Sequence, residues 1–365
     1  MKIIALPTLI VVLLATLSNP YSFGNNFKKY REKNRKIIDN WKPSTYTPSC
    51  TCSNPEWCKP IDNGTPLREK ELFGFKAGSN TIAYNWTHIT SIAWGISQTE
   101  LCTAHRHGVK VIMGAPSPIL SSNTTEREIW IKNTVAQIVE RGVDGITFDY
   151  ESPISASSEK GQYYAQLIQG TREALHKISP SYQTTVCVAW SPDSIDGRSY
   201  PIMDLADASD ALYVMDYDTR SQIFDACLAS ANAPYPGTIR GIQRYLDIGV
   251  SPDKLILGIP WYGYHYPCLQ GTSPTDRYCE IKRVPFRGVN CSDAAGAELA
   301  LDEMLNLYND KVNVTASGYD ENMAAPWFNT FDGKQVEQYW YDSPTSLILK
   351  YEYAKLMKLR GVGPL

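Results

Sequence analysis

Asp-Gly-Ile-Thr-Phe-Asp-Tyr-Glu, residues 144–151, is a short apolar run whose end carries acidic residues. It follows a helix-like run at residues 130–141, and we interpret it as a β-strand. Similar apolar runs recur along the chain, and helix-like stretches lie between most of them. The expected strands are residues 72–76, 91–95, 110–114, 145–151, 185–190, 211–216 and 255–261, with an eighth beginning at Gly361.

The clearest of the helix-like stretches are residues 129–141, 160–178, 238–248 and 346–359. Strands that alternate with helices imply βα units and a parallel sheet. Seven strands and the start of an eighth favour an α/β fold of the (β/α)8 TIM-barrel type. A doubly wound open sheet is the alternative, but no Gly-rich phosphate loop follows the first strand. Residues from about 265 to 341 are too many for one connection, so we expect a small inserted subdomain there.

The acids of the octapeptide are expected to share one face of their strand. Alternate side chains of a strand point the same way, so Thr147, Asp149 and Glu151 face one side and Phe148 and Tyr150 the other. Two crowded carboxylates repel each other, and one of them tends to hold a proton. A protonated carboxyl is the general acid that cleavage of a bond between sugars requires. A strand end with solvated acids is the alternative interpretation, but acids are uncommon inside strand patterns.

Aromatic and acidic side chains recur at the predicted strand ends, where active sites of α/β barrels lie. They are Trp94, Glu151, Trp190, Asp216, Tyr217, Asp218 and Trp261. Their coincidence predicts one shared cleft. The alternative interpretation is that the tryptophans pack in the barrel core and that Asp218 makes a structural hydrogen bond. His105 and His107 fall in a predicted turn, where we expect them at the surface.

The octapeptide resembles the D-G-x-D-x-D-x-E signature of glycoside hydrolase family 18. It matches at Asp144, Gly145, Asp149 and Glu151, and Thr147 replaces the middle acid. Further resemblances follow in the same order along the chain, at residues 215–218, 258–263 and 340–342. The resemblance implies a barrel fold and hydrolysis of N-acetylglucosamine-containing oligosaccharides, with no cofactor and no metal.

The resemblance also implies a role for each acid. Glu151 would protonate the glycosidic oxygen, and the substrate's own N-acetyl carbonyl would be the nucleophile. Asp149 would orient the acetamido N–H, and Tyr217 would donate a hydrogen bond to the acetamido oxygen. Asp144 starts the strand and is expected to be structural. Thr147 can hydrogen-bond Asp149 but cannot share its charge, so we expect an altered pH profile. The sugar-binding candidates are Trp261, Asp218, Met215, Trp190 and Trp94.

Four further segments resemble a lysosomal branch of the same family, at residues 50–58, 189–192, 231–235 and 285–288. This resemblance implies a retaining enzyme that cleaves the GlcNAc-β1,4-GlcNAc bond in the chitobiose core of Asn-linked glycans. A carbohydrate-binding protein without activity is one alternative, and the intact Glu151 argues against it. A chitinase acting on chitin oligomers is another, and cleft shape would decide between them.

The residues before the expected barrel carry targeting and processing features. Residues 1–18 are expected to be a secretory signal, because Lys2 precedes an apolar run too short for a membrane span. Residues 19–48 form a polar, basic leader, and residues 49–365 carry the barrel. We expect a lysosomal or extracellular monomer without membrane association. The net charge of −3 gives no indication of a nucleic-acid partner.

Nine cysteines in a secreted chain predict disulfides and one unpaired thiol. A zinc site is the weaker alternative for the clustered cysteines, because no matching histidine spacing accompanies them. Glycosylation acceptor patterns occur at Asn63, Asn85, Asn123, Asn290 and Asn313.

The residues Gly361–Leu365 supply only the start of an eighth strand. In family 18 this strand leads into a tryptophan that floors the sugar pocket. We therefore expect an incomplete eighth strand and helix, exposed edges on the first and seventh strands, and reduced stability and activity.

Overall fold

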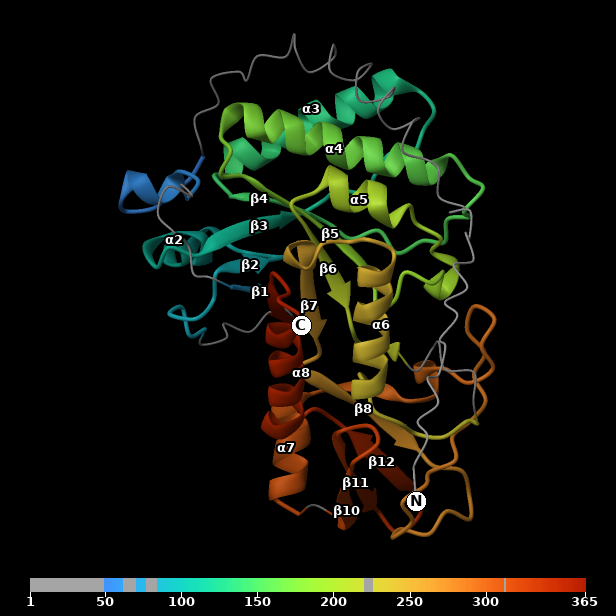
Figure 1. The fold of residues 1–365 in the computed structure, drawn as a ribbon. Helices are drawn as coiled ribbons and strands as arrows, with labels where there is room; N and C mark the ends of the chain where they lie inside the picture. The colour runs from blue at the N-terminus through green and yellow to red at the C-terminus, as the bar shows by residue number, and fades with distance from the viewer. Residues whose placement is uncertain (1–48, 62–69, 77–83, 220–225, 312) are drawn as a thin grey trace, which may run out of the picture. The chain divides into compact units, whose positions relative to one another are not determined.

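The computed structural model describes residues 49–61, 70–76, 84–219, 226–311 and 313–365 (Figure 1). The expected signal and leader, residues 1–48, lie outside the described residues, and so does Asn63. Among the residues described, the helices are all too short or too polar to cross a membrane.

Eight parallel strands form a closed barrel with the order β1-β13-β7-β6-β5-β4-β3-β2. In chain order they are β1 (Glu71–Phe75), β2 (Ser91–Ala93), β3 (Lys110–Gly114), β4 (Gly145–Phe148), β5 (Gln183–Ala189), β6 (Ala211–Met215), β7 (Leu255–Ile259) and β13 (Gly361–Pro364). The predicted (β/α)8 barrel is confirmed. Each of the eight expected strands is present, with ends that differ from the predicted ones by up to three residues.

Helices follow most of the strands and pack around the barrel (Figure 1). They are α2 (Gln98–Arg106), α3 (Thr124–Arg141), α4 (Lys160–Ile178), α5 (Ile202–Ala208), α6 (Tyr235–Asp247) and α8 (Pro344–Leu356). Short 3-10 turns occur at Pro55–Cys58, Ile195–Gly197, Pro252–Lys254 and Asp293–Ala295. All seven residues of β5 are buried, because helices cover the sheet outside and side chains fill it inside.

Side chains of β4 alternate between the helices and the barrel interior. The Phe148 ring packs against Trp130 of α3 and Tyr164 of α4. Thr147 points the other way, and its hydroxyl lies 3.7 Å from the Cys187 sulfur of β5. The predicted alternation is therefore confirmed at this strand.

Tyr213 of β6 fills the middle of the barrel and determines which residues fit opposite it. A Cβ atom on Gly258 of β7 would overlap the Tyr213 ring and would lie 2.7 Å from the Val214 carbonyl oxygen. A Cβ atom on Gly363 of β13 would overlap the same ring, whose hydroxyl donates to the Gly363 carbonyl. Both glycines are required by the size of one buried phenol.

The eighth strand closes the barrel. Strand β13 pairs with β7 from Gly361 to Pro364 and with β1 at Gly361 and Val362. The backbone of Leu365 continues the pairing with Ile259 and Trp261. The expectation of exposed edges on the first and seventh strands is wrong, because four residues of β13 are enough to pair both.

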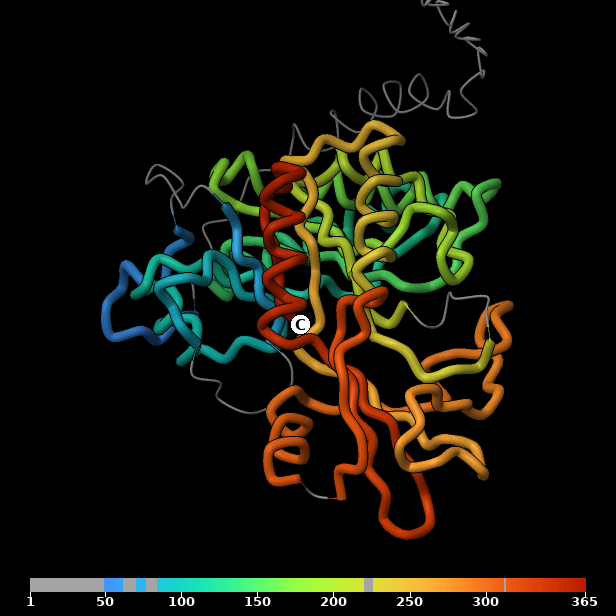
Figure 2. Tube along the Cα trace, turned by 60° about the horizontal axis from the view of Figure 1, so that its bottom comes forward, coloured from blue at the N-terminus to red at the C-terminus, as the bar shows by residue number. Residues whose placement is uncertain are grey.

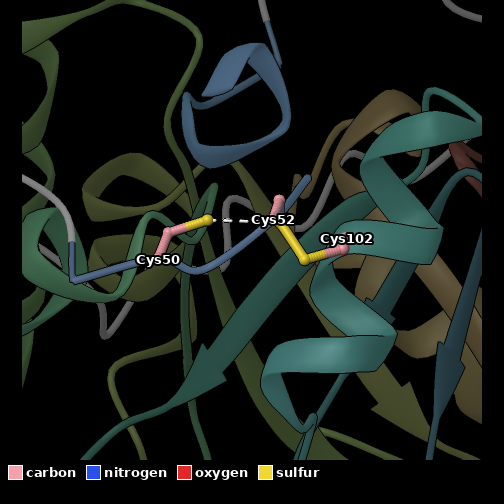
Figure 3. A group of neighbouring side chains, drawn as sticks. All are labelled: Cys50, Cys52 and Cys102. Carbon is pink, nitrogen blue, oxygen red and sulfur yellow. Dashed lines mark hydrogen bonds between the residues drawn. A yellow bond between two sulfur atoms is a disulfide. The ribbon is translucent and has the colours of Figure 1, made fainter. Parts of the chain in front are cut away.

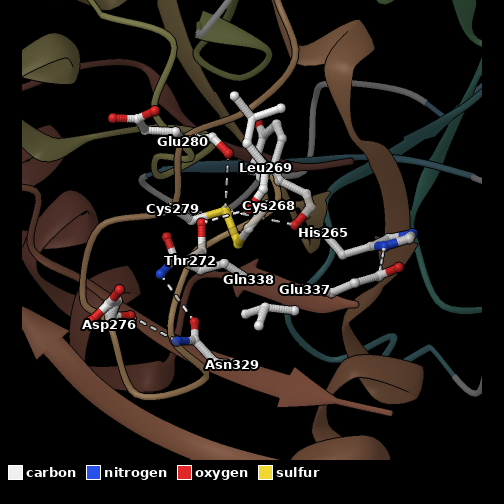
Figure 4. Close-up of a disulfide and its surroundings, with 12 residues drawn as sticks. His265, Cys268, Leu269, Thr272, Asp276, Cys279, Glu280, Asn329, Glu337 and Gln338 are labelled. Atoms are coloured by element: carbon white, nitrogen blue, oxygen red, sulfur yellow. Dashed lines mark hydrogen bonds and ion pairs between the residues drawn. A yellow bond between two sulfur atoms is a disulfide. The ribbon is translucent and has the colours of Figure 1, made fainter. Parts of the chain in front are cut away.

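An antiparallel sheet forms the predicted inserted subdomain, and its strands gather to one side of the barrel (Figures 1 and 2). Its order is β10-β11-β12-β8-β9. The elements are β8 (Tyr262–Pro267), β9 (Ala297–Ala300), α7 (Leu301–Asn309), β10 (Val314–Asp320), β11 (Ala325–Phe331) and β12 (Val336–Trp340). The Cys268–Cys279 disulfide and the neighbouring Asn329 and Gln338 amides fix the long connection between β8 and β9 (Figure 4).

Four disulfides are present: Cys50–Cys58, Cys52–Cys102, Cys227–Cys291 and Cys268–Cys279. Cys187 is the free, buried thiol, so the predicted disulfides and the odd thiol are confirmed. The sulfurs of Cys50, Cys52 and Cys102 lie within 4.8 Å of one another (Figure 3). Since each of them already belongs to a disulfide, this cluster has no free thiolate for zinc.

Candidate active site

A cavity of about 360 Å³ opens at the carboxyl ends of β4, β5 and β6. Side chains from the barrel and from the insertion line it: Glu151, Trp190, Ile195, Asp196, Arg198, Met215, Tyr217, Asp218, Tyr264, Phe286, Arg287 and Asp293. The cavity therefore brings together five of the predicted site residues, namely Glu151, Trp190, Met215, Tyr217 and Asp218.

Glu151 lies three residues beyond the end of β4, with its side chain 56% exposed to the cavity mouth. Its Oε2 atom accepts a hydrogen bond from Nη1 of Arg198 at 2.9 Å. On either side of Glu151, the hydroxyl of Tyr200 donates to the carbonyls of Tyr150 and Ser152. The carboxyl is thus held by a backbone clamped on both sides, at a place that a substrate can reach.

Asp149 is largely buried and lies two residues before Glu151, just after the end of β4. Burial and the nearby charge of Glu151 raise the pKa of Asp149 to about 6, and Arg198 opposes the shift. Among the described residues, its Oδ1 atom has no hydrogen-bond partner. A buried acid that holds its proton near pH 6 can exchange it within the site.

The hydroxyl of Thr147 lies near the Cys187 sulfur, and the structure shows no hydrogen bond between Thr147 and Asp149, both of which are described residues. Burial raises the pKa of the Cys187 thiol, so this side chain stays neutral beneath Asp149. The family signature has an acid at position 147, where this chain has threonine. Cys187 therefore supplies no negative charge in place of that acid.

Tyr217 and Asp218 follow directly after β6. Burial raises the pKa of Tyr217, which keeps its phenol protonated and able to donate. Asp218 accepts hydrogen bonds from the hydroxyls of Tyr262 at 2.6 Å and Tyr264 at 3.2 Å. Burial nevertheless raises the pKa of Asp218 to about 6. Two tyrosines of the insertion thereby fix an acid of the barrel.

The three predicted tryptophans have different surroundings. Trp190 is buried in the wall of the Glu151 cavity. Trp261 is 51% exposed after β7, and its indole N–H donates to the Tyr351 hydroxyl. Trp94 lines a separate cavity of about 430 Å³ with residues of α2 and β3. Neither Trp261 nor Trp94 lines the Glu151 cavity in this structure.

Asp144 lies at the other end of β4 from Glu151 and is buried. It accepts hydrogen bonds from the backbone N–H groups of Ile61 and Val111, both at 2.6 Å, and contacts Nε2 of His105 at 2.8 Å. Nδ1 of His105 lies 2.6 Å from the carbonyl of Trp57. The surface prediction for His105 is wrong, because this ring connects α2, β4 and the N-terminal segment. His107 is exposed as predicted.

The four described acceptor asparagines, Asn85, Asn123, Asn290 and Asn313, are all exposed. Asn123 caps α3 by accepting from the N–H of Thr125. Asn290 accepts from Arg283 at 2.6 Å, next to the Cys227–Cys291 disulfide.

Several residues around the cavity were not predicted from the sequence. Arg198, Asp196 and Tyr200 belong to the connection after β5, and Arg287 belongs to the insertion. The Pro-Phe-Arg-Gly segment at 285–288 is recognisable as a motif in the sequence, but its partner in the fold is not. No periodic pattern marks these loop residues, and only the folded chain brings them to Glu151.

Comparison with known proteins assigns the chain to a class. The family model described as glycosyl hydrolases family 18 matches residues 108–363. A solved family 18 chitinase from Cycas revoluta in complex with (GlcNAc)3 has a TM-score of 0.64 at 19% identity, covering 80% of this chain and 94% of its own. The chain belongs to glycosyl hydrolases family 18.

Within that family, the chain is similar to a particular enzyme. It is 40% identical to di-N-acetylchitobiase from Rattus norvegicus over 319 residues, which cover 86% of this chain and 85% of the relative. The same fold also occurs in a chitinase-like agglutinin from Robinia pseudoacacia, with a TM-score of 0.61 at 20% identity over 80% of this chain and 94% of its own.

Proposed function

We propose that the protein hydrolyses the GlcNAc-β1,4-GlcNAc bond in the chitobiose core of Asn-linked glycans. The observation that carries this proposal is the Glu151 carboxyl, exposed at the mouth of a cavity with the buried Asp149 beside it. The similarity to a di-N-acetylchitobiase supports the choice of bond. The complex of a family 18 chitinase with (GlcNAc)3 supports the class of sugar.

In the proposed mechanism, Glu151 protonates the oxygen of the scissile bond. The acetamido carbonyl of the bound sugar attacks the anomeric carbon, which gives an oxazolinium intermediate without a protein nucleophile. Glu151 then accepts a proton from the water that opens the ring, and the anomeric configuration is retained. Asp149 orients the acetamido N–H and balances the positive charge, while Tyr217 donates to the acetamido oxygen. Met215, Trp190 and Asp218 line the sugar site, and Trp261 and Trp94 are proposed contacts for more distant sugar units.

Binding without hydrolysis is the second candidate function. It is favoured by one observation, the shared fold of the agglutinin from Robinia pseudoacacia. The presence of Glu151 supports hydrolysis instead. The two functions differ in whether bound sugar is turned over, so one product assay separates them.

The test is incubation of the protein with chitobiose-core oligosaccharides and with chitin oligomers, followed by analysis of the products. The expected result is cleavage between the two core N-acetylglucosamines. The Glu151→Gln variant should bind the same sugars but turn them over about 10²–10⁴ times more slowly, because an amide is not a useful proton donor. Near-normal turnover by this variant would remove Glu151 from the mechanism. Binding without turnover by the unmodified protein would favour the second function.

We also propose that the protein passes through the secretory pathway to the lysosome or to the outside of the cell, as a monomer carrying N-linked glycans. The four disulfides support an oxidising compartment during folding. Expression in secretory cells, with and without enzymatic removal of glycans, would test this route by the change in apparent mass.

A further inference from the structure

We propose that Arg198 is a positioning residue that holds the general acid Glu151 in the orientation that hydrolysis requires. This inference rests on the proposed role of Glu151. It adds to the proposed site a residue from the β5–α5 connection, which lies outside the signature at residues 144–151.

Arg198 is buried and has fixed partners on both sides. Its side chain is 7% exposed, and it bridges Oε2 of Glu151 at 2.9 Å and Oδ2 of Asp196 at 3.1 Å. A third contact runs from Nε to the Ile195 carbonyl at 3.4 Å. A planar guanidinium with donors in a fixed fork can hold two carboxylates at once, whereas an ammonium is a point charge. The position of the Glu151 carboxyl is therefore defined by a side chain that cannot itself move freely.

The backbone around Arg198 is tied to the backbone around Glu151. The N–H of Ile154 donates to the Gly197 carbonyl at 3.1 Å, and the N–H of Ser199 donates to the Ile154 carbonyl at 2.9 Å. Together with the two hydrogen bonds from Tyr200, these contacts join the connection after β5 to the end of β4. The Arg198–Glu151 pair thus spans two segments already fixed to each other.

The β5–α5 connection adopts a backbone that is unfavourable for its residues. Ser194 has a φ of 58° and Asp196 a φ of 55°, in the left-handed region that side chains other than glycine rarely occupy. Such conformations persist where surrounding contacts enforce them, and they concentrate at functional sites. Here the enforced turn places Asp196 and Arg198 next to each other and against Glu151.

The charges facing Glu151 come from four elements. Asp149 lies on its own segment, Arg198 and Asp196 on the β5–α5 connection, Asp218 after β6, and Arg287 and Asp293 on the insertion. Arg287 reaches only the backbone carbonyl of Glu151, at 3.4 Å, and lies 3.9 Å from Asp196. Arg198 is thus the cation that directly contacts the Glu151 carboxylate among these groups.

The bridge between Glu151 and Asp196 requires the planar fork of a guanidinium. A methionine at position 198 removes every donor that this side chain offers to the Glu151 carboxyl. A lysine keeps the positive charge but cannot bridge Glu151 and Asp196.

The experiment measures kcat and KM for Arg198→Met and Arg198→Lys on a chitobiose-core oligosaccharide. For Arg198→Met we expect kcat to fall about tenfold with little change in KM, as for loss of one charge-assisted hydrogen bond. For Arg198→Lys we expect kcat to fall by several-fold, again with little change in KM, because the charge remains but the bridge to Asp196 is lost.

The matched control is Arg244→Met. Arg244 also binds an acid of the β5–α5 connection, Asp193 at 2.9 Å, but it does not contact Glu151. Its kcat and KM should equal those of the unmodified protein. An unchanged kcat in both Arg198 variants would overturn the inference. If Arg198→Met does not fold, the kcat of Arg198→Lys decides, and an undiminished value overturns it. A fully active Glu151→Gln would instead refute the proposed function itself.

Discussion

At the scale of the residue, burial determines the protonation of the acids around the site. The pKa values of Asp149, Asp216 and Asp218 are each raised to about 6, and burial is the largest cause for all three. The Glu151 carboxyl is half exposed and paired with Arg198. Two acids that are two positions apart in the sequence therefore have different environments.

A residue-scale prediction concerns the substrate's own nucleophile. A disaccharide with hydroxyl in place of the 2-acetamido group, such as cellobiose, should not be hydrolysed, because Asp149 and Tyr217 would have no acetamido group to orient. The measurement is product release from paired GlcNAc and glucose disaccharides at equal concentration. Efficient cleavage of the glucose compound would mean that a protein side chain supplies the nucleophile.

The closeness of Asp149 and Glu151 was predictable from the sequence, since the two acids lie two residues apart just after one strand. The contacts of His105 and Arg198 were not predictable. His105 meets Asp144 across 39 positions, and Arg198 meets Glu151 across 47, in both cases between different elements. A histidine before Arg106, His107 and Gly108 has the surroundings of a surface turn in the sequence, and only the folded chain brings the buried carboxylate to it.

At the scale of the element, strand β13 shows how little chain is needed to close a barrel. Four residues pair with β7 and β1, while Arg360 before them donates to Oε2 of Glu71 at 2.6 Å. Glu71 also accepts from Gln183 of β5 at 2.7 Å and from Ser91 of β2 at 2.9 Å. One carboxylate at the amino-terminal end of the barrel thus joins strands from several sides of it.

An element-scale prediction follows from the glycine opposite Tyr213. Gly258→Ala should destabilise the protein by about 1–3 kcal/mol, because the new methyl group overlaps a ring that has no free space around it. Chemical denaturation with a circular dichroism signal would measure the loss.

Gly237→Ala is the matched control for that substitution. Gly237 lies in the first turn of α6, where a Cβ atom would lie 3.5 Å from the Pro234 ring, an ordinary contact. This variant should be neutral or slightly more stable, since alanine favours the helix. Equal stability of the two variants would show that the barrel interior adapts to the added group.

The strands and helices of the barrel followed from alternation in the sequence, but the insertion did not. Neither β10 nor β9 contains a fully buried residue, although β10 pairs with β11 and β9 pairs with β8. Without a buried face, neither strand carries the period-two pattern that sequence reasoning uses. The length and the cysteines of the segment predicted a subdomain, but they did not predict its five-stranded sheet.

At the scale of the whole molecule, several ionisable groups make the folded state more stable at acidic pH. The raised pKa values of Asp149, Asp216 and Asp218 mean that the folded state binds protons between pH 4 and about 6 which the unfolded chain has released. Their effect is that stability falls as pH rises through this window. His105 acts in the same direction. Burial lowers its pKa, but the hydrogen bond and the charge of Asp144 outweigh burial, so the pKa of His105 is raised. The stabilisation from this pair is lost as pH rises through the raised pKa.

The corresponding prediction is a higher melting temperature near pH 5 than near pH 7.5. A lower limit is set by acids such as Asp210, whose pKa is lowered to about 2 by His176 and Arg172 despite its burial. Their stabilisation is lost as pH falls below about 4. Calorimetry across this range measures the effect, and Asp149→Asn should flatten part of the slope. A melting temperature that rises steadily from pH 5 to 7.5 would contradict the assignment.

The closure of the barrel by β13 has a consequence for how the chain acquires its structure. Glu71 and Arg360 meet across 289 positions, so β1 has one side unpaired until the entire intervening chain has emerged and folded. Contacts of such long range are slow to form, because a large loop must be ordered before they repay its cost. During that interval the open edge of β1 can pair with another chain. We therefore expect newly made protein to depend on chaperones until its last strand has docked.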